Sequence, residues 1–258
     1  FKIYKIFKED THEKKIFFSF QYFVNIWSII FVKLILRGKL LIYEVNHLDE
    51  FNYYTDFKEF IKKKIIKILI KILYRYSDIV ASNSKELSND LSEYIGRKVY
   101  TLYNPCFKKI TLRKINYKPK SKIKILNISR FVSQKDHFTL LNAIKYSKIK
   151  DKISLVLVGY GDNYKKIKRF IYKNKINAKI YINEKKLDKF YKKTNLYVCS
   201  SLYEGLPTTV IEAASYCLPI ISSNFKSGSK EIFKNGRGGF IFKVQDFKNL
   251  SKILMKFY

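Results

Sequence analysis

Cysteine is scarce in this chain, and its few cysteines argue against both a disulfide framework and a zinc site. Cys106, Cys199 and Cys217 show no paired spacing, whereas disulfide-rich domains and zinc sites need cysteines in pairs or close clusters. No N-terminal stretch has the basic, apolar and small-residue order of a cleavable signal peptide. The expectation is therefore a cytoplasmic protein in a reducing compartment.

Acidic residues are also few: 21 Asp and Glu oppose 52 Lys and Arg, which gives a formal net charge of +31. A charge of this size is typical of nucleic-acid binders. However, the abundant residues Lys, Ile, Asn, Tyr and Phe are those of A/T-rich codons, and the positive charge is spread over both halves of the chain. We therefore expect no nucleic-acid partner, although such a surface should be attracted to anionic lipid.

The sequence has no internal repeat, and residues 123–258 alternate short apolar runs with amphipathic segments. This order predicts a parallel sheet covered on both faces, that is, a doubly wound Rossmann-like domain with ligands at the carboxyl ends of its strands. The predicted strands cover 122–129, 153–159, 178–182, 195–201, 218–223 and 238–242, and the predicted helices cover 135–146, 163–173, 186–193, 208–216 and a segment from Asp246.

Residues 1–107 predict a second Rossmann-like α/β domain, less regular and incomplete. The expected strands cover 1–7, 39–46, 77–83 and 98–104, and the expected helices cover 16–36, 62–76 and 84–95. The charged stretch 108–122 has no apolar period and is the predicted linker. Because the chain begins with Phe and falls short of the strands of a full Rossmann unit, we expect it to be truncated at its N-terminus.

Two apolar segments of this half leave alternatives open. Residues 16–32 contain no charge and form either a buried helix or a membrane span, although they are shorter than the ~20 residues that a bilayer needs. Residues 62–76 carry one apolar and one basic stripe: Ile65, Ile68, Leu69, Ile72 and Tyr76, and Lys63, Lys67 and Lys71. The second segment is either an ordinary domain helix with a solvated basic face or a helix that rests on an anionic membrane surface.

The segment 199–219 predicts an anion site. A strand leads into a turn, and Pro207 opens a helix without needing a hydrogen-bond acceptor of its own. The N–H groups that follow are expected to be free at the positive end of the helix dipole, where a phosphate binds readily. They belong to Thr208, Thr209 and Val210. Two carboxylates, Glu204 and Glu212, flank this site and suit the hydroxyl groups of a nucleotide sugar.

Two further groups follow neighbouring strands of the same predicted sheet. Arg130 and Lys135 come after the first strand, where two cations could hold a diphosphate. Gly159 and Gly161 come after the next strand, where small residues let a ligand approach the backbone. A Gly-x-Gly turn alone is weak evidence, but its occurrence with two cations and a helix start on one sheet edge favours a sugar-diphosphate site.

At this point the chain resembles the retaining GT-B glycosyltransferases of glycosyltransferase family 4. The resemblance is strongest over 123–242 and rests on the Glu-x7-Glu pattern of EGLPTTVIE, the R-x4-K of RFVSQK and the segment SKEIFKNGRGGFIF. YSDIVASNS and YNPC add weaker support. The resemblance implies the GT-B fold: two Rossmann-like parallel-sheet domains, here with an incomplete N-terminal one.

The resemblance also implies residue roles. Glu204 would face the donor sugar as a catalytic residue, and Glu212 would bind the ribose. The diphosphate would be held by Arg130, Lys135, Gly159, Gly161, Leu206, Pro207, Thr208 and Thr209. His47 stands where many members place a histidine facing the transferred sugar, or else it is a loop histidine without a role.

The implied reaction is transfer of a sugar, with retention, from a UDP- or GDP-sugar to a glycan or polyprenyl-linked acceptor in bacterial surface-polysaccharide assembly. The sequence lacks an Asp-x-Asp motif, and two cations with a helix start can replace a metal, so we expect no metal or other cofactor. The expected place is the cytoplasm, with peripheral contact to the inner face of the cytoplasmic membrane through 62–76.

Three departures from the family pattern leave other functions open. A glycine-rich first loop and the usual last helix crossing to the first domain are missing, and Asn183 replaces the usual glycine in a base-contacting loop. The alternatives are a non-catalytic truncated relative, a basic nucleic-acid or membrane-binding protein, and a GT-B-fold sugar epimerase. The Glu-x7-Glu with R-x4-K combination argues against the epimerase.

Overall fold

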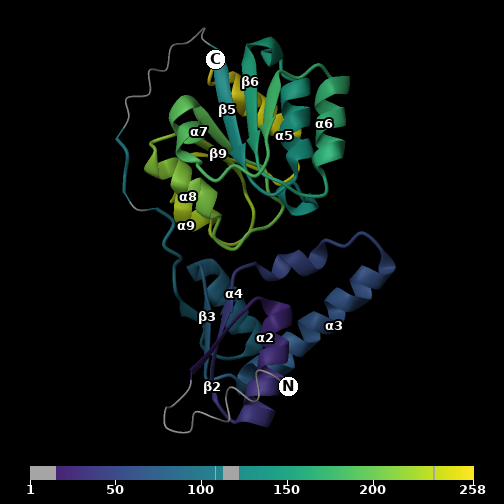
Figure 1. Ribbon diagram of the computed structural model, residues 1–258, viewed down its shortest axis with the longest axis vertical. Helices are drawn as coiled ribbons and strands as arrows, with labels where there is room; N and C mark the ends of the chain where they lie inside the picture. Colours follow the sequence, from purple (N-terminus) through teal and green to yellow (C-terminus); the bar gives the residue numbers. More distant parts are fainter. Residues whose placement is uncertain (1–15, 108, 113–121, 235) are drawn as a thin grey trace. The chain divides into compact units, whose positions relative to one another are not determined.

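The computed structural model describes residues 16–107, 109–112, 122–234 and 236–258, which form two compact α/β units, 1–103 and 104–258. Each unit has a parallel sheet, as the sequence predicts (Figure 1). The strand predicted at 1–7 and most of the linker predicted at 108–122 lie outside the described residues.

The N-terminal unit has a four-stranded sheet of order β1-β2-β3-β4 in which every pairing is parallel. Its strands are β1 (Ile16–Phe20), β2 (Lys39–Glu44), β3 (Ile79–Ser82) and β4 (Tyr100–Thr101). Its helical elements are α2 (Tyr22–Ile29), the π-helical η1 (Ile30–Leu36), the 3-10 turns η2 (Leu48–Asn52) and η3 (Tyr74–Tyr76), α3 (Phe57–Leu73) and α4 (Lys85–Ile95).

The helix predicted at 16–36 is wrong at its start, because 16–20 is strand β1. An uncharged apolar run shows no periodicity that separates strand from helix, and here parallel pairing with β2 decides. Gln21, with φ of 73°, turns the chain from β1 into α2. Among the described residues, no helix has both the length and the apolar character to span a bilayer.

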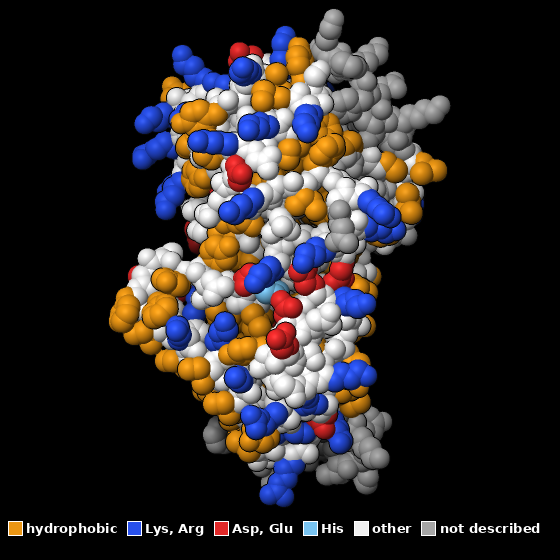
Figure 2. All heavy atoms as spheres, turned by 180° about the vertical axis from the view of Figure 1, so that it is seen from behind, with side chains coloured by type: hydrophobic (Ala, Val, Ile, Leu, Met, Phe, Trp, Pro, Cys, Tyr) orange, Lys and Arg blue, Asp and Glu red, His pale blue; other side chains and the backbone are white. Residues whose placement is uncertain are grey.

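The three helices α2, α3 and α4 share one hydrophobic cluster with β2 and β3. Buried Ile26, Ile70 and Leu91 meet Leu40 and Val80 there. Helix α3 also starts earlier than predicted, because Asp56 caps it by accepting a hydrogen bond from the N–H of Glu59 at 2.8 Å. Seen from behind, Figure 2 shows further hydrophobic side chains left at the surface along α3.

A polar group lies inside this hydrophobic cluster at the end of β2. The Glu44 carboxyl is fully buried, and its Oε1 accepts hydrogen bonds from Asn25 Nδ2 at 2.7 Å and from the Tyr74 hydroxyl. Within the described residues, Glu44 Oε2 has no hydrogen-bond partner. Burial raises the pKa of Glu44 well above its usual range, although the two hydrogen bonds oppose this rise. The folded state therefore favours the neutral, protonated form of the Glu44 carboxyl group.

We expect Glu44→Gln to remove a pH dependence of stability. A raised folded-state pKa means that the folded protein holds the proton more tightly, so stability is lost as pH rises above the unfolded value of about 4.3. Glutamine cannot ionise, so the variant's advantage in unfolding free energy should grow from pH 5 to pH 8 in urea titrations. Glu93→Gln, at an exposed position of α4, is the control. Parallel pH profiles for wild type and Glu44→Gln would contradict the assignment.

The C-terminal unit has a six-stranded parallel sheet of order β10-β9-β8-β5-β6-β7. Its strands are β5 (Ile123–Ile128), β6 (Ile153–Val158), β7 (Ala178–Tyr181), β8 (Leu196–Cys199), β9 (Ile220–Ser223) and β10 (Phe240–Phe242). Its helices are α5 (His137–Lys145), α6 (Tyr164–Lys173), α7 (Asp188–Lys193), α8 (Thr208–Ser215), α9 (Ser229–Phe233) and α10 (Phe247–Met255), with 3-10 turns η4 (Ser133–Lys135) and η5 (Lys150–Lys152).

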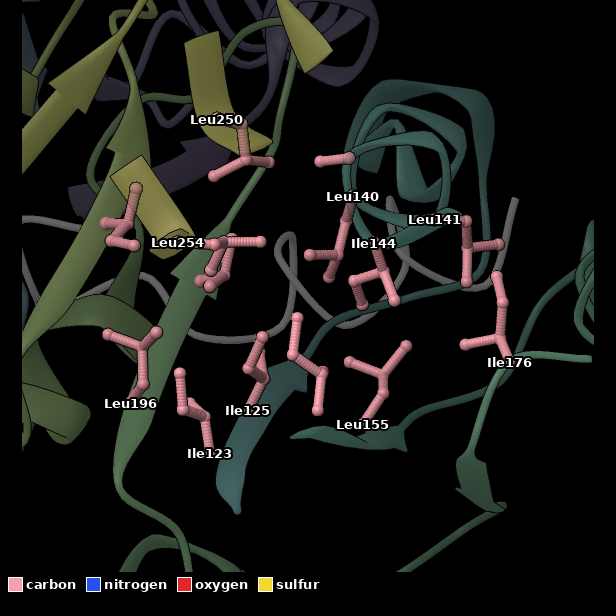
Figure 3. Close-up of a cluster of buried hydrophobic side chains, with 14 of the residues drawn as sticks. Ile123, Ile125, Leu140, Leu141, Ile144, Leu155, Ile176, Leu196, Leu250 and Leu254 are labelled. Carbon is pink, nitrogen blue, oxygen red and sulfur yellow. The ribbon is translucent and has the colours of Figure 1, made fainter. Parts of the chain in front are cut away.

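Helices cover both faces of this sheet. Along β5, Ile125 points to the cluster formed with α5, α6 and α10, and the next residue, Leu126, points to the cluster formed with α7, α8 and α9. Figure 3 shows the first cluster, in which Leu140 and Ile144 of α5 and Leu254 of α10 gather over the strands. The predicted doubly wound architecture is thus confirmed, with one short helix, α9, that was not among the predicted helices.

Candidate functional site

The predicted donor residues gather where the strand order of the C-terminal sheet reverses. Strands β5 and β8 are neighbours there, and their following connections diverge, which leaves a crevice at the carboxyl ends. A cavity of about 270 Å³ opens at this point. Its lining includes Arg130, Lys135, Glu204, Leu206, Pro207, Thr208 and Thr209.

The chemical centre of this cavity is an ion pair between Lys135 and Glu204. Lys135 Nζ lies 2.5 Å from Glu204 Oε1, and the two side chains are only 15% and 9% exposed. Ser201 Oγ donates a hydrogen bond to the same Glu204 oxygen at 2.6 Å. The backbone of Lys135 is also fixed, because Ser200 Oγ donates to its carbonyl at 3.0 Å. The loops after β5 and β8 are therefore joined at the site, and exposed Arg130 adds a second cation at its rim.

The start of α8 forms another wall of the cavity. Pro207 takes the cap position rather than the first helical position, and no side chain caps the helix. Among the described residues, the N–H groups of Thr208 and Thr209 meet no acceptor. The prediction is wrong for Val210, whose N–H donates to the Pro207 carbonyl at 3.1 Å. Two N–H groups, rather than three, are thus available to an anion.

The two glycines after β6 have different surroundings. A Cβ at Gly159 would lie 1.9 Å from the Ser129 carbonyl oxygen, so any side chain would collide with the backbone after β5. Gly159 also lines a second hollow of about 580 Å³, which shares Arg130 with the first and contains Asn183. Gly161 packs against the chain itself, since a Cβ there would lie 2.7 Å from the Phe131 carbonyl oxygen. Of these two glycines, Gly159 lines one of the two hollows described here and Gly161 lines neither.

Glu212 lies further along α8, outside the lining of both hollows described here. The Tyr191 hydroxyl donates a hydrogen bond to Glu212 Oε2 at 2.7 Å. The Tyr191 ring stacks on Tyr216, with 5.0 Å between centroids and 12° between planes. Burial raises the pKa of Glu212, and the Tyr191 hydrogen bond opposes that rise. Tyr191 therefore fixes one carboxylate oxygen and leaves Oε1 for another partner.

A largely buried polar chain that includes two residues of the cavity wall, Asn127 and Ser129, was not predicted. Asn127 Nδ2 donates to the Val198 carbonyl at 2.9 Å, and Ser129 Oγ donates to Asn127 Oδ1 at 2.9 Å. His137 Nε2 lies 3.0 Å from Ser129 Oγ. Burial and the Lys135 charge lower the pKa of His137 to about 3, so its ring is neutral. The Asn127 hydrogen bond ties β5 to β8, and only the position of Asn127 and Ser129 at the end of a strand could have indicated this chain.

His47 lies in the N-terminal unit, at the end of β2. Its Nδ1 accepts a hydrogen bond from the N–H of Asp49 at 3.0 Å, so the ring proton sits on Nε2, which is 2.8 Å from Asp90 Oδ2. The ring is 2% exposed and caps the 3-10 turn η2. His47 thus has a structural role in its unit, and its contact with a sugar stays a prediction.

Metal coordination is not indicated within the described part of the chain. No three His, Cys, Asp or Glu side chains there stand close enough together to hold a metal ion. The absence of a metal from the reaction remains an expectation from the sequence.

The chain is similar in sequence to a family of known proteins. The family described as glycosyl transferases group 1 matches residues 108–258. An uncharacterized glycosyltransferase of Methanocaldococcus jannaschii is 32% identical over 197 residues, 70% of this chain and 48% of that protein. An N-acetylgalactosamine-N,N'-diacetylbacillosaminyl-diphospho-undecaprenol 4-alpha-N-acetylgalactosaminyltransferase of Campylobacter jejuni is 26% identical over 190 residues, 70% of this chain and 50% of its own.

Solved structures agree on the fold. The structure of HepE from Anabaena in complex with UDP and glucose gives a TM-score of 0.76 at 15% identity, over 98% of this chain and 70% of that chain. Two units built on parallel sheets are the GT-B type of α/β fold. The chain spans about half the length of the two curated relatives.

Proposed function

Since this chain belongs to the group 1 glycosyl transferases, we propose that it transfers a sugar from a UDP- or GDP-sugar to a glycan or polyprenyl-linked acceptor, with retention. The observation that carries the proposal is the cavity at the strand-order reversal, which combines the Lys135–Glu204 ion pair with the free N–H groups at the start of α8. Cations and N–H donors suit a diphosphate, and a carboxylate can accept hydrogen bonds from the hydroxyls of a sugar.

In this proposal the leaving diphosphate lies between the two cations and the helix start. The bond between the anomeric carbon and the diphosphate oxygen breaks, and Arg130, Lys135 and the N–H groups of α8 stabilise the negative charge that develops on that oxygen. The acceptor hydroxyl attacks the face that the diphosphate leaves and passes its proton to the departing diphosphate oxygen. Glu204 holds the sugar while it carries positive charge. With these donors the reaction needs no metal.

Glu212 is the proposed ligand of the ribose. Its Oε2 is held by Tyr191, which leaves Oε1 to accept from the ribose hydroxyls. The second hollow, beside Gly159 and Asn183, is large enough for the base at about 580 Å³. Neither UDP nor GDP is favoured by the residues there.

The acceptor is proposed to be a growing surface glycan or a polyprenyl-linked sugar. The name of the Campylobacter relative includes a diphospho-undecaprenol-linked substrate, which supports an acceptor of this class. His47 is the proposed contact of the transferred sugar from the N-terminal unit. The corresponding place is the cytoplasmic side of a membrane, with the basic segment 62–76 toward the lipid.

A thermal-shift panel of nucleoside diphosphates tests the proposal. Ligand at a hundred times its dissociation constant stabilises a protein by ~2.7 kcal/mol, so UDP or GDP should raise the melting temperature clearly, and nucleoside monophosphates less. A nucleic-acid binder would instead bind oligonucleotides with an affinity that falls steeply with salt. No shift with any nucleoside diphosphate would overturn the proposal.

A further inference from the structure

Helix α3 has apolar side chains on two sides, and only one side belongs to the core. Ile70 is fully buried, and Ile66, Leu69 and Leu73 pack against the hydrophobic cluster of the N-terminal unit. These residues provide the buried apolar side that an ordinary domain helix packs against its core. The apolar stripe predicted from the sequence is largely a different set of residues.

The second apolar side faces outward. Its residues are spaced three or four apart, so they share one face of the helix. They are Phe57, Ile61, Ile65, Ile68, Ile72 and Tyr76, and each is between 42% and 74% exposed. We call this set the outer stripe. Figure 2 shows hydrophobic side chains interspersed with Lys and Arg along this helix. Five of these side chains lie on α3 and Tyr76 lies in the turn η3 that follows it. Such a row of exposed large apolar side chains is unusual unless something covers it.

The residues that flank the outer stripe are basic. Exposed Lys58 and Lys62 lie along one margin, and exposed Lys64, Lys71 and Arg75 lie along the other. Between Glu59 and Asp78 the sequence has no acidic residue, and Glu59 itself pairs with Lys63 at 3.0 Å. Long basic side chains beside an apolar strip can reach lipid phosphates while their stems lie on the apolar region.

Helix α2 extends the apolar surface. Phe23 and Trp27, one helical turn apart, are 56% and 58% exposed, with ring centroids 6.4 Å apart. Lys62 Nζ lies 6.0 Å from the centre of the Phe23 ring, so this aromatic pair adjoins the lysine margin of α3. Tryptophan favours the boundary between lipid and water.

We propose that the outer stripe of α3, with Phe23 and Trp27, is a docking surface for an anionic lipid bilayer. The basic residues beside the stripe favour a membrane over a protein partner. A protein that covered a purely apolar helix face would not require five cations beside it, whereas a negatively charged membrane attracts each of them. The surface lies in the N-terminal unit and does not depend on the proposed donor site.

The single tryptophan of the chain gives a direct readout of docking. Vesicles of phosphatidylcholine with phosphatidylglycerol should shift Trp27 emission to the blue and carry the protein down on sedimentation, and pure phosphatidylcholine should do so far less. Ile65→Ser with Ile68→Ser should weaken partitioning about tenfold, without unfolding, because both side chains are exposed. Lys64→Glu with Lys71→Glu should weaken it by about tenfold or more.

A matched control lies on α6. Lys165→Glu with Lys166→Glu makes the same charge change beside a buried apolar residue, Ile167, and should leave partitioning within a factor of about two or three. Equal loss in both charge variants would mean that net charge alone acts, and would overturn the proposal. So would absence of binding, or self-association through the stripe in light scattering. Nucleotide binding is measured on the same stripe variants. If they lose lipid binding but still bind nucleotide, the docking surface is affected and the donor site is not.

Discussion

Replacing Lys135 with alanine is expected to lower kcat/KM for sugar transfer by about 10² to 10³-fold. The change removes one of the two cations proposed for the diphosphate. It also leaves the Glu204 carboxylate, 9% exposed, without the ammonium that stands 2.5 Å away. Initial rates with a UDP- or GDP-sugar would measure the loss. Lys124→Ala, at an exposed position of β5, makes the same charge change away from the cavity and should leave kcat/KM nearly unchanged.

A second variant separates catalysis from stability. Removing one partner of a partly buried ion pair destabilises the protein, because the other charge is left uncompensated. Lys135→Met combined with Glu204→Gln removes both charges, so its melting temperature should recover toward that of the wild type. Its turnover should not recover. If Lys135→Ala kept kcat/KM within a factor of about three, the role of Lys135 at the diphosphate would be wrong.

Substitutions of the two carboxylates should affect turnover and nucleotide affinity differently. Glu204→Gln retains a group that can accept from Ser201 but loses the charge facing the sugar, so kcat should fall by about 10²-fold or more while UDP or GDP affinity changes little. Glu212→Ala removes charge-assisted hydrogen bonds to the ribose. These are worth about 1.5–3 kcal/mol, so nucleotide affinity should fall by roughly 10- to 100-fold.

Calorimetric titration of UDP and GDP, beside initial rates, measures both carboxylate variants. Tyr191→Phe is the intermediate case, because it frees Glu212 Oε2 without removing the carboxylate, and it should weaken binding less than Glu212→Ala. Equal and negligible effects of Glu204→Gln and Glu212→Ala would contradict the assigned roles.

The architecture of the C-terminal unit could be predicted from its sequence because its strands are short, mostly apolar runs that alternate with amphipathic helices. The strand β1 could not. Its run of Ile and Phe reads equally as helix or strand, and only the pairing with β2, contributed by residues 39–43, selects the strand. The local sequence pattern cannot predict secondary structure where pairing with a strand distant in sequence determines it.

The same distinction applies to the site. Arg130, Lys135 and Glu204 could be singled out because each follows a strand of one sheet. Their pairing could not, since Lys135 and Glu204 lie 69 residues apart and their contact depends on the neighbouring placement of β5 and β8. The surface of α3 is a similar case. Its sequence has an apolar stripe, but only the packing of Ile70 toward the core shows that Ile65, Ile68 and Ile72 point outward.

A crystal structure with bound UDP or GDP tests the central claim most directly, because it shows where the diphosphate lies. The account predicts phosphate oxygens within hydrogen-bonding distance of Arg130, Lys135 and the N–H groups of Thr208 and Thr209. Other cavities offer a clear contrast, such as the basic groove of about 360 Å³ that Phe138 and Lys166 help to line. A nucleotide ordered in that groove, with the crevice between β5 and β8 empty, would contradict the account.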